Sequence, residues 1–114
     1  MVTHLVLLKP RPDLSAADRE RLIVAFERAL TEIPAIRHVR VGRRVRHGAG
    51  YEAGMPDTAD YLVAIDLDHV EGLAAYLRHP AHEDLAGRFT ESLVGALVYD
   101  FESVEIGSLR DLPG

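Results

Sequence analysis

The sequence lacks cysteine, tryptophan and asparagine, and it contains no apolar stretch near the roughly 20 residues that span a bilayer. Without cysteine, the chain forms no disulfide, has no thiolate metal ligand and has no cysteine nucleophile. Residues 1–4 lead straight into a strand-like segment and do not form the basic and apolar regions of a signal peptide. These absences predict a cytoplasmic protein with no membrane partner.

The charge is unevenly distributed along the 114 residues. The net charge is −5, which argues against a nucleic-acid partner. Against this acidic total, one ten-residue stretch is strongly basic and contains Arg37, Arg40, Arg43, Arg44 and Arg46, with His38 and His47 beside them. No aromatic residue alternates with these arginines, as a groove for single-stranded nucleic acid requires. We interpret the stretch as a solvated edge strand, with a bound anion as the alternative.

The order of apolar and breaking residues predicts seven main elements. Period-two patterns predict strands over residues 3–9, 39–45, 61–67 and 97–101. Helical spacing predicts helices over 16–33, after a Ser15 cap, over 69–78, after an Asp68 cap, and over 81–93. Residues 47–58 contain three glycines and Pro56, so we expect a mobile loop there that closes over a pocket.

The order β-α-β-β-α-α-β predicts an α+β, ferredoxin-like fold with one antiparallel sheet and its helices on one face. The other face of the sheet then carries apolar side chains without cover, and exposing them to water costs about 25 cal/mol per Å². Two such sheets packed face to face would cover both, so we expect a symmetric homodimer that forms an α/β barrel.

The segment Tyr76-Leu77-Arg78-His79-Pro80-Ala81-His82 carries the candidate chemistry. Histidine titrates near neutral pH, and tyrosine donates a hydrogen bond to a developing oxyanion. His82 lies near the start of a helix, where the positive end of the helix dipole disfavours imidazolium and favours the neutral base. We therefore predict His82 and Tyr76 as catalytic residues. His4 lies on a strand face from which it could reach the same cavity.

His79 is three residues after Tyr76, on the same helix face, and is a further substrate-binding candidate. The alternative for His79 is that its ring satisfies the free carbonyl groups at the helix end. For Tyr76 and His82 the alternative is also structural, with a buried phenol and a residue that shapes the turn around Pro80.

Five segments of the chain resemble the stress-responsive dimeric α/β-barrel (Dabb) domains. They are His4-Leu5-Val6-Leu7-Leu8-Lys9, Ile33-Pro34-Ala35-Ile36, Val39-Arg40-Val41-Gly42-Arg43, the Tyr76–His82 segment and Val98-Tyr99-Asp100-Phe101. The resemblance implies one domain over residues 2–104, followed by a short tail over 105–114. It also implies a homodimer that is joined through its sheet faces.

The family includes polyketide cyclases that act on poly-β-keto thioesters, and the resemblance implies roles for several residues. By position it implies catalysis by Tyr76 and His82, and a pocket lined by His4 and Tyr61. Some resembling proteins hold a magnesium ion on backbone carbonyls, here those of Leu30, Ile33 and Ile36; oxygen ligands suit that cation. No organic cofactor is implied. Monooxygenases with the same barrel use asparagine and tryptophan, which this chain lacks.

Three functional hypotheses follow. The first is a cyclase- or lyase-like enzyme that uses the Tyr/His pair on a β-keto or aromatic substrate. The second is a stress-response protein that binds a hydrophobic or aromatic metabolite without changing it. The third is a structural dimer, in which the motif only shapes a turn.

Overall fold

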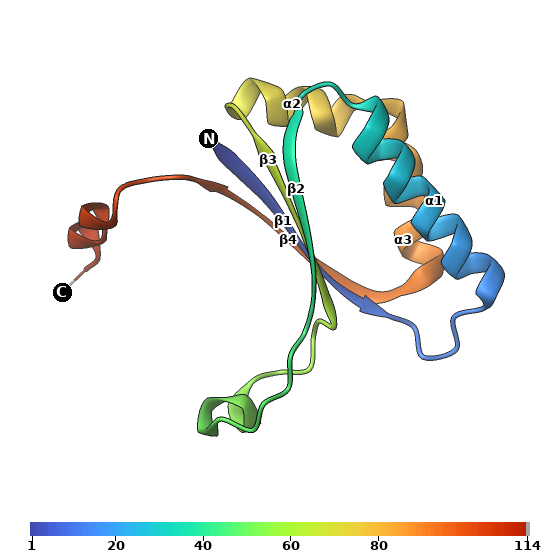
Figure 1. The fold of residues 1–114 in the computed structure, drawn as a ribbon, viewed down its shortest axis with the longest axis horizontal. Helices are drawn as coiled ribbons and strands as arrows, with labels where there is room; N and C mark the ends of the chain where they lie inside the picture. The colour runs from blue at the N-terminus through green and yellow to red at the C-terminus, as the bar shows by residue number, and fades with distance from the viewer. Residues whose placement is uncertain (114) are drawn as a thin grey trace.

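The computed structural model describes residues 1–113 as a four-stranded sheet with three helices on one face (Figure 1). The strands are β1 (Val2–Pro10), β2 (Ile36–Arg43), β3 (Tyr61–Leu67) and β4 (Leu93–Glu102). The helices are α1 (Ala16–Glu32), α2 (Val70–Arg78) and α3 (Pro80–Ser92). Two short 3₁₀ helices, η1 (Gly50–Gly54) and η2 (Ile106–Asp111), lie outside this body.

The sheet has the order β2-β3-β1-β4, and each neighbouring pair of strands is antiparallel. This is the ferredoxin-like topology, so the predicted fold class is confirmed. Within residues 1–113, no helix combines the length and the hydrophobicity needed to cross a membrane.

The core lies between the sheet and the helices, because β1 and β3 each turn one set of alternate residues toward α1 and α3. Ser15 caps α1 as predicted, since its Oγ accepts a hydrogen bond from the Asp18 amide at 3.0 Å. The core consists mainly of aliphatic residues, among them Val6, Leu8, Leu22, Ala29, Ile33, Val63, Ile65, Leu67 and Leu85. Phe26 of α1 and Phe89 of α3 join the helices, with ring centroids 5.8 Å apart.

The other face of the sheet is open. Leu97, Tyr99 and Phe101 of β4 point away from the helices and remain 38–54% exposed. Leu5 and Leu7 of β1 share this face, because β1 alternates and its His4, Val6 and Leu8 are buried under the helices. One protomer therefore leaves a broad apolar surface in water.

Some predicted boundaries were wrong. The predicted Asp68 cap is incorrect, because the His69 ring accepts the Gly72 amide at 3.3 Å, whereas Asp68 accepts a 2.7 Å hydrogen bond from Arg37. The strand predicted over 39–45 begins at Ile36, and the last strand begins at Leu93. The short tail predicted over 105–114 contains η2; Gly114 lies outside the described residues.

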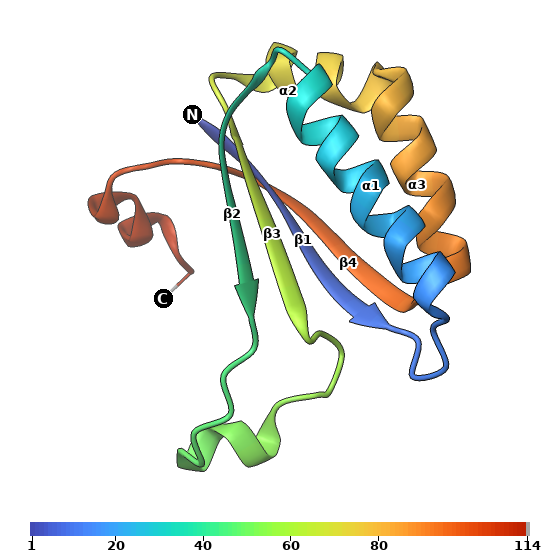
Figure 2. The ribbon, with the colours of Figure 1, turned by 45° about the vertical axis from the view of Figure 1, so that its right-hand side comes forward.

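The loop after β2 is held to the body by an ion cluster at its return to β3. Oδ1 of Asp57 forms ion pairs with the Lys9 ammonium at 3.1 Å and with the guanidinium groups of Arg46 at 3.1 Å and Arg44 at 3.4 Å. The Lys9 contact lowers the pKa of Asp57, and the Asp57 contact raises the pKa of Lys9. Part of the basic stretch thus serves to anchor this loop, which Figure 2 shows beyond one end of the sheet.

We expect Asp57→Asn to speed amide hydrogen exchange in residues 44–60 while the exchange of the core strands stays slow. The folded-state pKa of Asp57 is depressed, so its contribution is present at neutral pH and is lost as pH falls through that lowered value. Acidification of the wild type should therefore lower the protection of these amides as the variant does, once the rates are corrected for the slower intrinsic exchange at low pH. Unchanged exchange in Asp57→Asn, measured beside Asp111→Asn as a control, would show that the cluster does not hold the loop.

Candidate active site

A cavity of about 220 Å³ lies between the β1/β4 side of the sheet and the three helices. Its walls are mostly apolar and come from Val6, Phe26, Leu77, Leu85, Ala86, Phe89 and Val98. Three polar side chains complete the lining, namely His4 of β1, Tyr76 of α2 and His82 of α3. The structure therefore brings together three polar residues, of which His4 and His82 lie 78 positions apart in the sequence.

His4 forms the polar floor of this cavity. Its side chain is buried, and its Nδ1 lies 2.6 Å from Oδ1 of Asp100. The two residues face each other because β1 and β4 pair His4 with Asp100 in register. The Asp100 carboxylate accepts a hydrogen bond from the Nδ1–H group of His4. This bond orients the ring and leaves Nε2 on its other side.

Tyr76 is 1% exposed, and its ring packs at a tilt of 58–59° against both histidines. Its ring centroid lies 5.2 Å from that of His4 and 4.8 Å from that of His82. Burial, and secondarily the charge of Asp100, raise the pKa of Tyr76 to about 12. The phenol therefore stays protonated at neutral pH and is a hydrogen-bond donor.

His82 lies in the first turn of α3, which begins at Pro80 because proline suits the first helical position. Its ring centroid is 6.5 Å from that of His4. Burial, and then the charge of His4, lower the pKa of His82, although a hydrogen bond to the Leu77 backbone and the charge of Glu83 oppose this. His82 is thus a neutral imidazole at pH 7, the form that accepts a proton.

His79, the neighbouring candidate, does not line this cavity. Its ring accepts the Ala81 amide at 3.0 Å and caps α3, while its own amide bonds to the Tyr76 carbonyl and ends α2. His79 therefore has a structural role, but its ring accepts an amide at the start of α3 instead of binding the carbonyls at the end of α2, as the alternative predicted. It is not among the residues that line the cavity.

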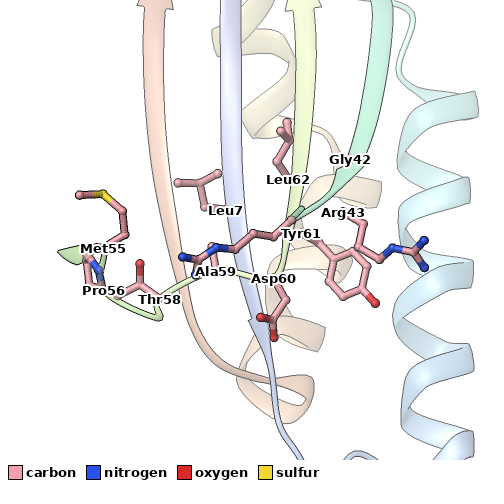
Figure 3. A pocket seen from close by; sticks show the side chains of 11 residues that line it. Leu7, Gly42, Arg43, Met55, Pro56, Thr58, Ala59, Asp60, Tyr61 and Leu62 are labelled. Atoms are coloured by element: carbon pink, nitrogen blue, oxygen red, sulfur yellow. The ribbon is translucent and has the colours of Figure 1, made fainter. Parts of the chain in front are cut away.

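Tyr61 also lies elsewhere, in a second cleft at the far end of β3 (Figure 3). Tyr61 is four residues before Ile65, the residue paired with His4, which corresponds to about 13 Å along the strand. The loop residues Met55, Pro56 and Thr58 line this second cleft and not the cavity. The predicted closure of loop 47–58 over the cavity is therefore wrong for a single protomer.

Asp100 is the site residue that the sequence reasoning missed. It lies on the same face of β4 as the apolar Val98, and it stands 96 residues from its partner. The only indication in the sequence was that a carboxylate on the last strand and a histidine on the first would face each other if these strands paired. Without the register of the two strands, the sequence does not predict a contact between His4 and Asp100.

The residues of the structure contain no cluster of three or more His, Asp or Glu side chains that could hold a metal ion, within the described range 1–113. The magnesium site expected on the carbonyls of Leu30, Ile33 and Ile36 stays a prediction. Two observations count against it. The Ile33 carbonyl accepts a hydrogen bond from the Ile36 amide at 3.4 Å. The Arg37 guanidinium donates a hydrogen bond to the adjacent Pro34 carbonyl at 3.3 Å. A cation there would meet the charge of Arg37.

The arrangement has the parts of an acid–base site. It offers a neutral base, a protonated phenol and an oriented second imidazole around a mostly apolar cavity. The ring distances of 4.8–6.5 Å allow one small ligand to touch all three polar groups.

A comparison with known families matches residues 2–103 to the stress-responsive A/B barrel domain. The chain belongs to this family. The resemblance noted in the sequence is thereby confirmed for nearly the whole chain.

Several known proteins are similar to this chain. Olivetolic acid cyclase of Cannabis sativa is 23% identical over 100 residues, which cover 88% of this chain and 94% of the cyclase. Hydroxynitrile lyase of Passiflora edulis shares the fold with a TM-score of 0.69 at 15% identity, over 88% and 90% of the two chains. A dimeric ferredoxin-like protein of unknown function from Thermobifida fusca has a TM-score of 0.66 at 23% identity, over 88% of each chain.

Proposed function

We propose that this A/B barrel protein is a cyclase- or lyase-like enzyme that performs acid–base chemistry on a small β-keto or aromatic carbonyl substrate without an organic cofactor. The observation that carries the proposal is the convergence of His82, Tyr76 and the His4–Asp100 pair on one apolar cavity. The similarity of the chain to olivetolic acid cyclase and to hydroxynitrile lyase supports the reaction class.

In the proposed reaction, His82 removes the acidic proton from a carbon between two carbonyl groups. The electron pair moves onto the carbonyl oxygen, and the enolate accepts a hydrogen bond from the Tyr76 hydroxyl. The enolate carbon then attacks a second carbonyl of the same molecule and forms a carbon–carbon bond. The new alkoxide takes back the proton from His82, so the base is restored.

His4 is a positioning residue in this scheme. The 2.6 Å bond to Asp100 fixes the plane of the His4 ring beside Tyr76. The Asp100 charge also helps to keep Tyr76 protonated, since it raises the pKa of the phenol. The carboxylate therefore acts on the chemistry through its neighbours.

The cavity favours a compact substrate. Its volume of about 220 Å³ is smaller than the pockets of about 300–1,000 Å³ that hold drug-sized ligands. The lining contains no arginine or lysine that would pair with a carboxylate inside it. A neutral aromatic ring or short acyl chain with one or two carbonyl groups suits these walls.

We further propose that the enzyme is a homodimer joined by its sheet faces. A barrel needs a closed sheet, whereas one chain supplies four strands and an open apolar face. A two-fold axis would pair this face with itself and bury the exposed residues of β1 and β4. The dimeric neighbour from Thermobifida fusca supports this assembly.

The test is turnover of a small panel by the purified protein, with an aromatic hydroxynitrile and a poly-β-keto thioester as probes. We expect one of them to react and Tyr76→Phe to slow the reaction by about 10²-fold or more, because it loses the oxyanion donor. Tyr61→Phe is the matched control and should leave the rate unchanged, as Tyr61 lies outside the cavity.

Ligand-observed NMR with the same compounds separates the alternatives. Binding that weakens in Tyr76→Phe without any turnover would favour the metabolite-binding protein. Neither binding nor turnover by a folded wild type would contradict the enzyme and leave the structural dimer.

A further inference from the structure

The second cleft has a volume of about 390 Å³ and lies where β2 and β3 lead into the loop between them (Figure 3). Its floor is one row of residues on the open face of the sheet, because the register pairs Leu62 with Gly42 on one side and with Leu7 on the other. The loop supplies a wall, which consists of Met55, Pro56 and Thr58. The volume falls in the range of about 300–1,000 Å³ that is usual for small-ligand sites.

Gly42 keeps the floor of this cleft low. A Cβ atom at this position would lie 3.4 Å from Cδ2 of Leu62, which is the lower limit of ordinary van der Waals contact. Any longer side chain would extend from there into the cleft. Glycine inside a strand weakens the strand, and it often occurs where a ligand or another backbone approaches closely. The glycine therefore leaves room for an occupant.

The loop wall is held in place by the protein itself. The Asp60 amide donates a hydrogen bond to the Leu8 carbonyl at 2.8 Å, and the Arg44 amide donates one to the Asp60 carbonyl at 2.8 Å. These two bonds fix the points at which the loop leaves and rejoins the sheet. The ion pairs of Asp57 hold the segment between them. A site that is formed before binding loses less conformational entropy when a ligand enters.

The charged residues around the cleft have an excess of one positive charge. They are Lys9, Arg43, Arg44 and Arg46, against Glu52, Asp57 and Asp60. The Arg44 side chain lines the cleft and is only 23% exposed. Within residues 1–113 it forms one hydrogen bond, from Nη1 to Oδ1 of Asp57 at 3.4 Å. Its other N–H groups suit a carboxylate, which accepts two parallel hydrogen bonds from a guanidinium.

We propose that this cleft is a second binding site, for a small amphipathic carboxylate such as a medium-chain acyl acid or an aromatic acid. Arg44 binds the carboxylate, and the apolar part of the ligand lies along Leu62 and Leu7 beside Met55. Arg44 and Gly42 are two residues apart, or about 7 Å along the strand, so a chain of several carbon atoms crosses the floor. The active-site cavity lies on the other face and has no arginine or lysine in its lining. The proposal therefore does not depend on the reaction proposed for that cavity.

The first experiment follows the amide NMR signals of isotope-labelled protein during a titration with octanoate. We expect saturable binding that shifts the signals of residues 42–44 and 55–62. Shifts confined to residues 76–89, which surround the active-site cavity, would overturn the proposal. The absence of saturable octanoate binding would overturn it as well.

Two variants test the walls of the cleft. Gly42→Leu fills the floor, and Met55→Asp places a charge in the apolar wall at a position that is 53% exposed and therefore not needed for the core. Each should raise the dissociation constant of octanoate by about tenfold or more. Val24→Asp on α1 is the matched control, because Val24 is also 53% exposed but does not line the cleft. Unchanged constants in both cleft variants would overturn the site.

Arg44→Gln tests the binding of the carboxylate, with octanol as an uncharged probe of the same walls. The variant should bind octanoate about tenfold or more weakly, since a hydrogen bond to a charged group contributes about 1.5–3 kcal/mol. Its affinity for octanol should stay that of the wild type, and Arg19→Gln on α1 should change neither affinity. Equal weakening of both ligands would mean that Arg44 only holds the loop, which contradicts its role as the carboxylate-binding group.

Two further measurements identify the other possible occupants. Ala86→Leu fills the active-site cavity and should leave octanoate binding unchanged, so this site and the proposed function fail separately. A larger loss of octanoate affinity in Ala86→Leu than in Gly42→Leu would overturn the proposal. The second copy of the proposed homodimer is the other candidate, because it packs on the same face of the sheet. If sedimentation equilibrium shows that Met55→Asp weakens the dimer while octanoate fails to bind the wild type, the second copy fills the cleft and the ligand site is overturned.

Discussion

The His82→Ala variant is expected to remain folded and to lose turnover by about 10²- to 10⁴-fold, the usual contribution of a general base. His82 combines a cavity-facing ring with a pKa below the ordinary value, whereas the other cavity imidazole, His4, is held by Asp100. The measurement is the steady-state rate on whichever probe the wild type converts, with circular dichroism to confirm the fold.

His79→Ala is the matched control, because it removes an imidazole three residues away that caps α3. It should keep its turnover and lose about 1 kcal/mol of stability, as is typical when a capping side chain is removed. A larger loss of rate in His79→Ala than in His82→Ala would reverse the assignment of the two histidines.

The pH profile follows from the same residue. The folded pKa of His82 lies below its ordinary value of about 6.5, so the base stays neutral, and the rate stays high, from neutral pH down past that value. The rate should then fall as pH drops through the lowered pKa. A wild-type profile that already declines between pH 8 and 7 would contradict the role of His82 as the base.

The second large effect is structural: Ile65→Ala should lower the free energy of unfolding by about 2–5 kcal/mol. Ile65 is 1% exposed at the centre of the core and pairs with His4 on one side and Val39 on the other. The loss is a large part of the about 5–15 kcal/mol that stabilises a typical domain.

Urea unfolding of Ile65→Ala measures this effect, with Val41→Ala as the control. Val41 of β2 lies on the same face of the sheet as Ile65 but is 68% exposed. Val41→Ala should change the stability of the isolated protomer by less than about 0.5 kcal/mol. Equal losses in the two variants would mean that the sheet is not stabilised mainly by the layer under the helices. The comparison is made at concentrations below dimerisation, so that the interface does not contribute.

Local patterns predicted much of the secondary structure. The Ser15 cap, the apolar stripe of α1 and the break at His79-Pro80 each depend on residues within a few positions of one another. The exact starts of β2 and β4 were not predictable in this way, because a strand extends as far as its neighbour offers hydrogen bonds. Asp68 failed as a cap for a similar reason: a better partner, Arg37, came from a distant part of the chain.

The candidate site was likewise predictable where its residues are close in the sequence, and not where they are distant. The sequence alone determined that Tyr76 and His82 lie close together, since a helix end and a proline turn separate them by only six residues, and it placed His4 on a strand face with buried neighbours. Only the tertiary structure decided that Asp100 holds His4 and that Tyr61 belongs to another cleft. Strand register controls these outcomes, and register arises from the packing of the whole sheet against its helices, which no short stretch of sequence encodes.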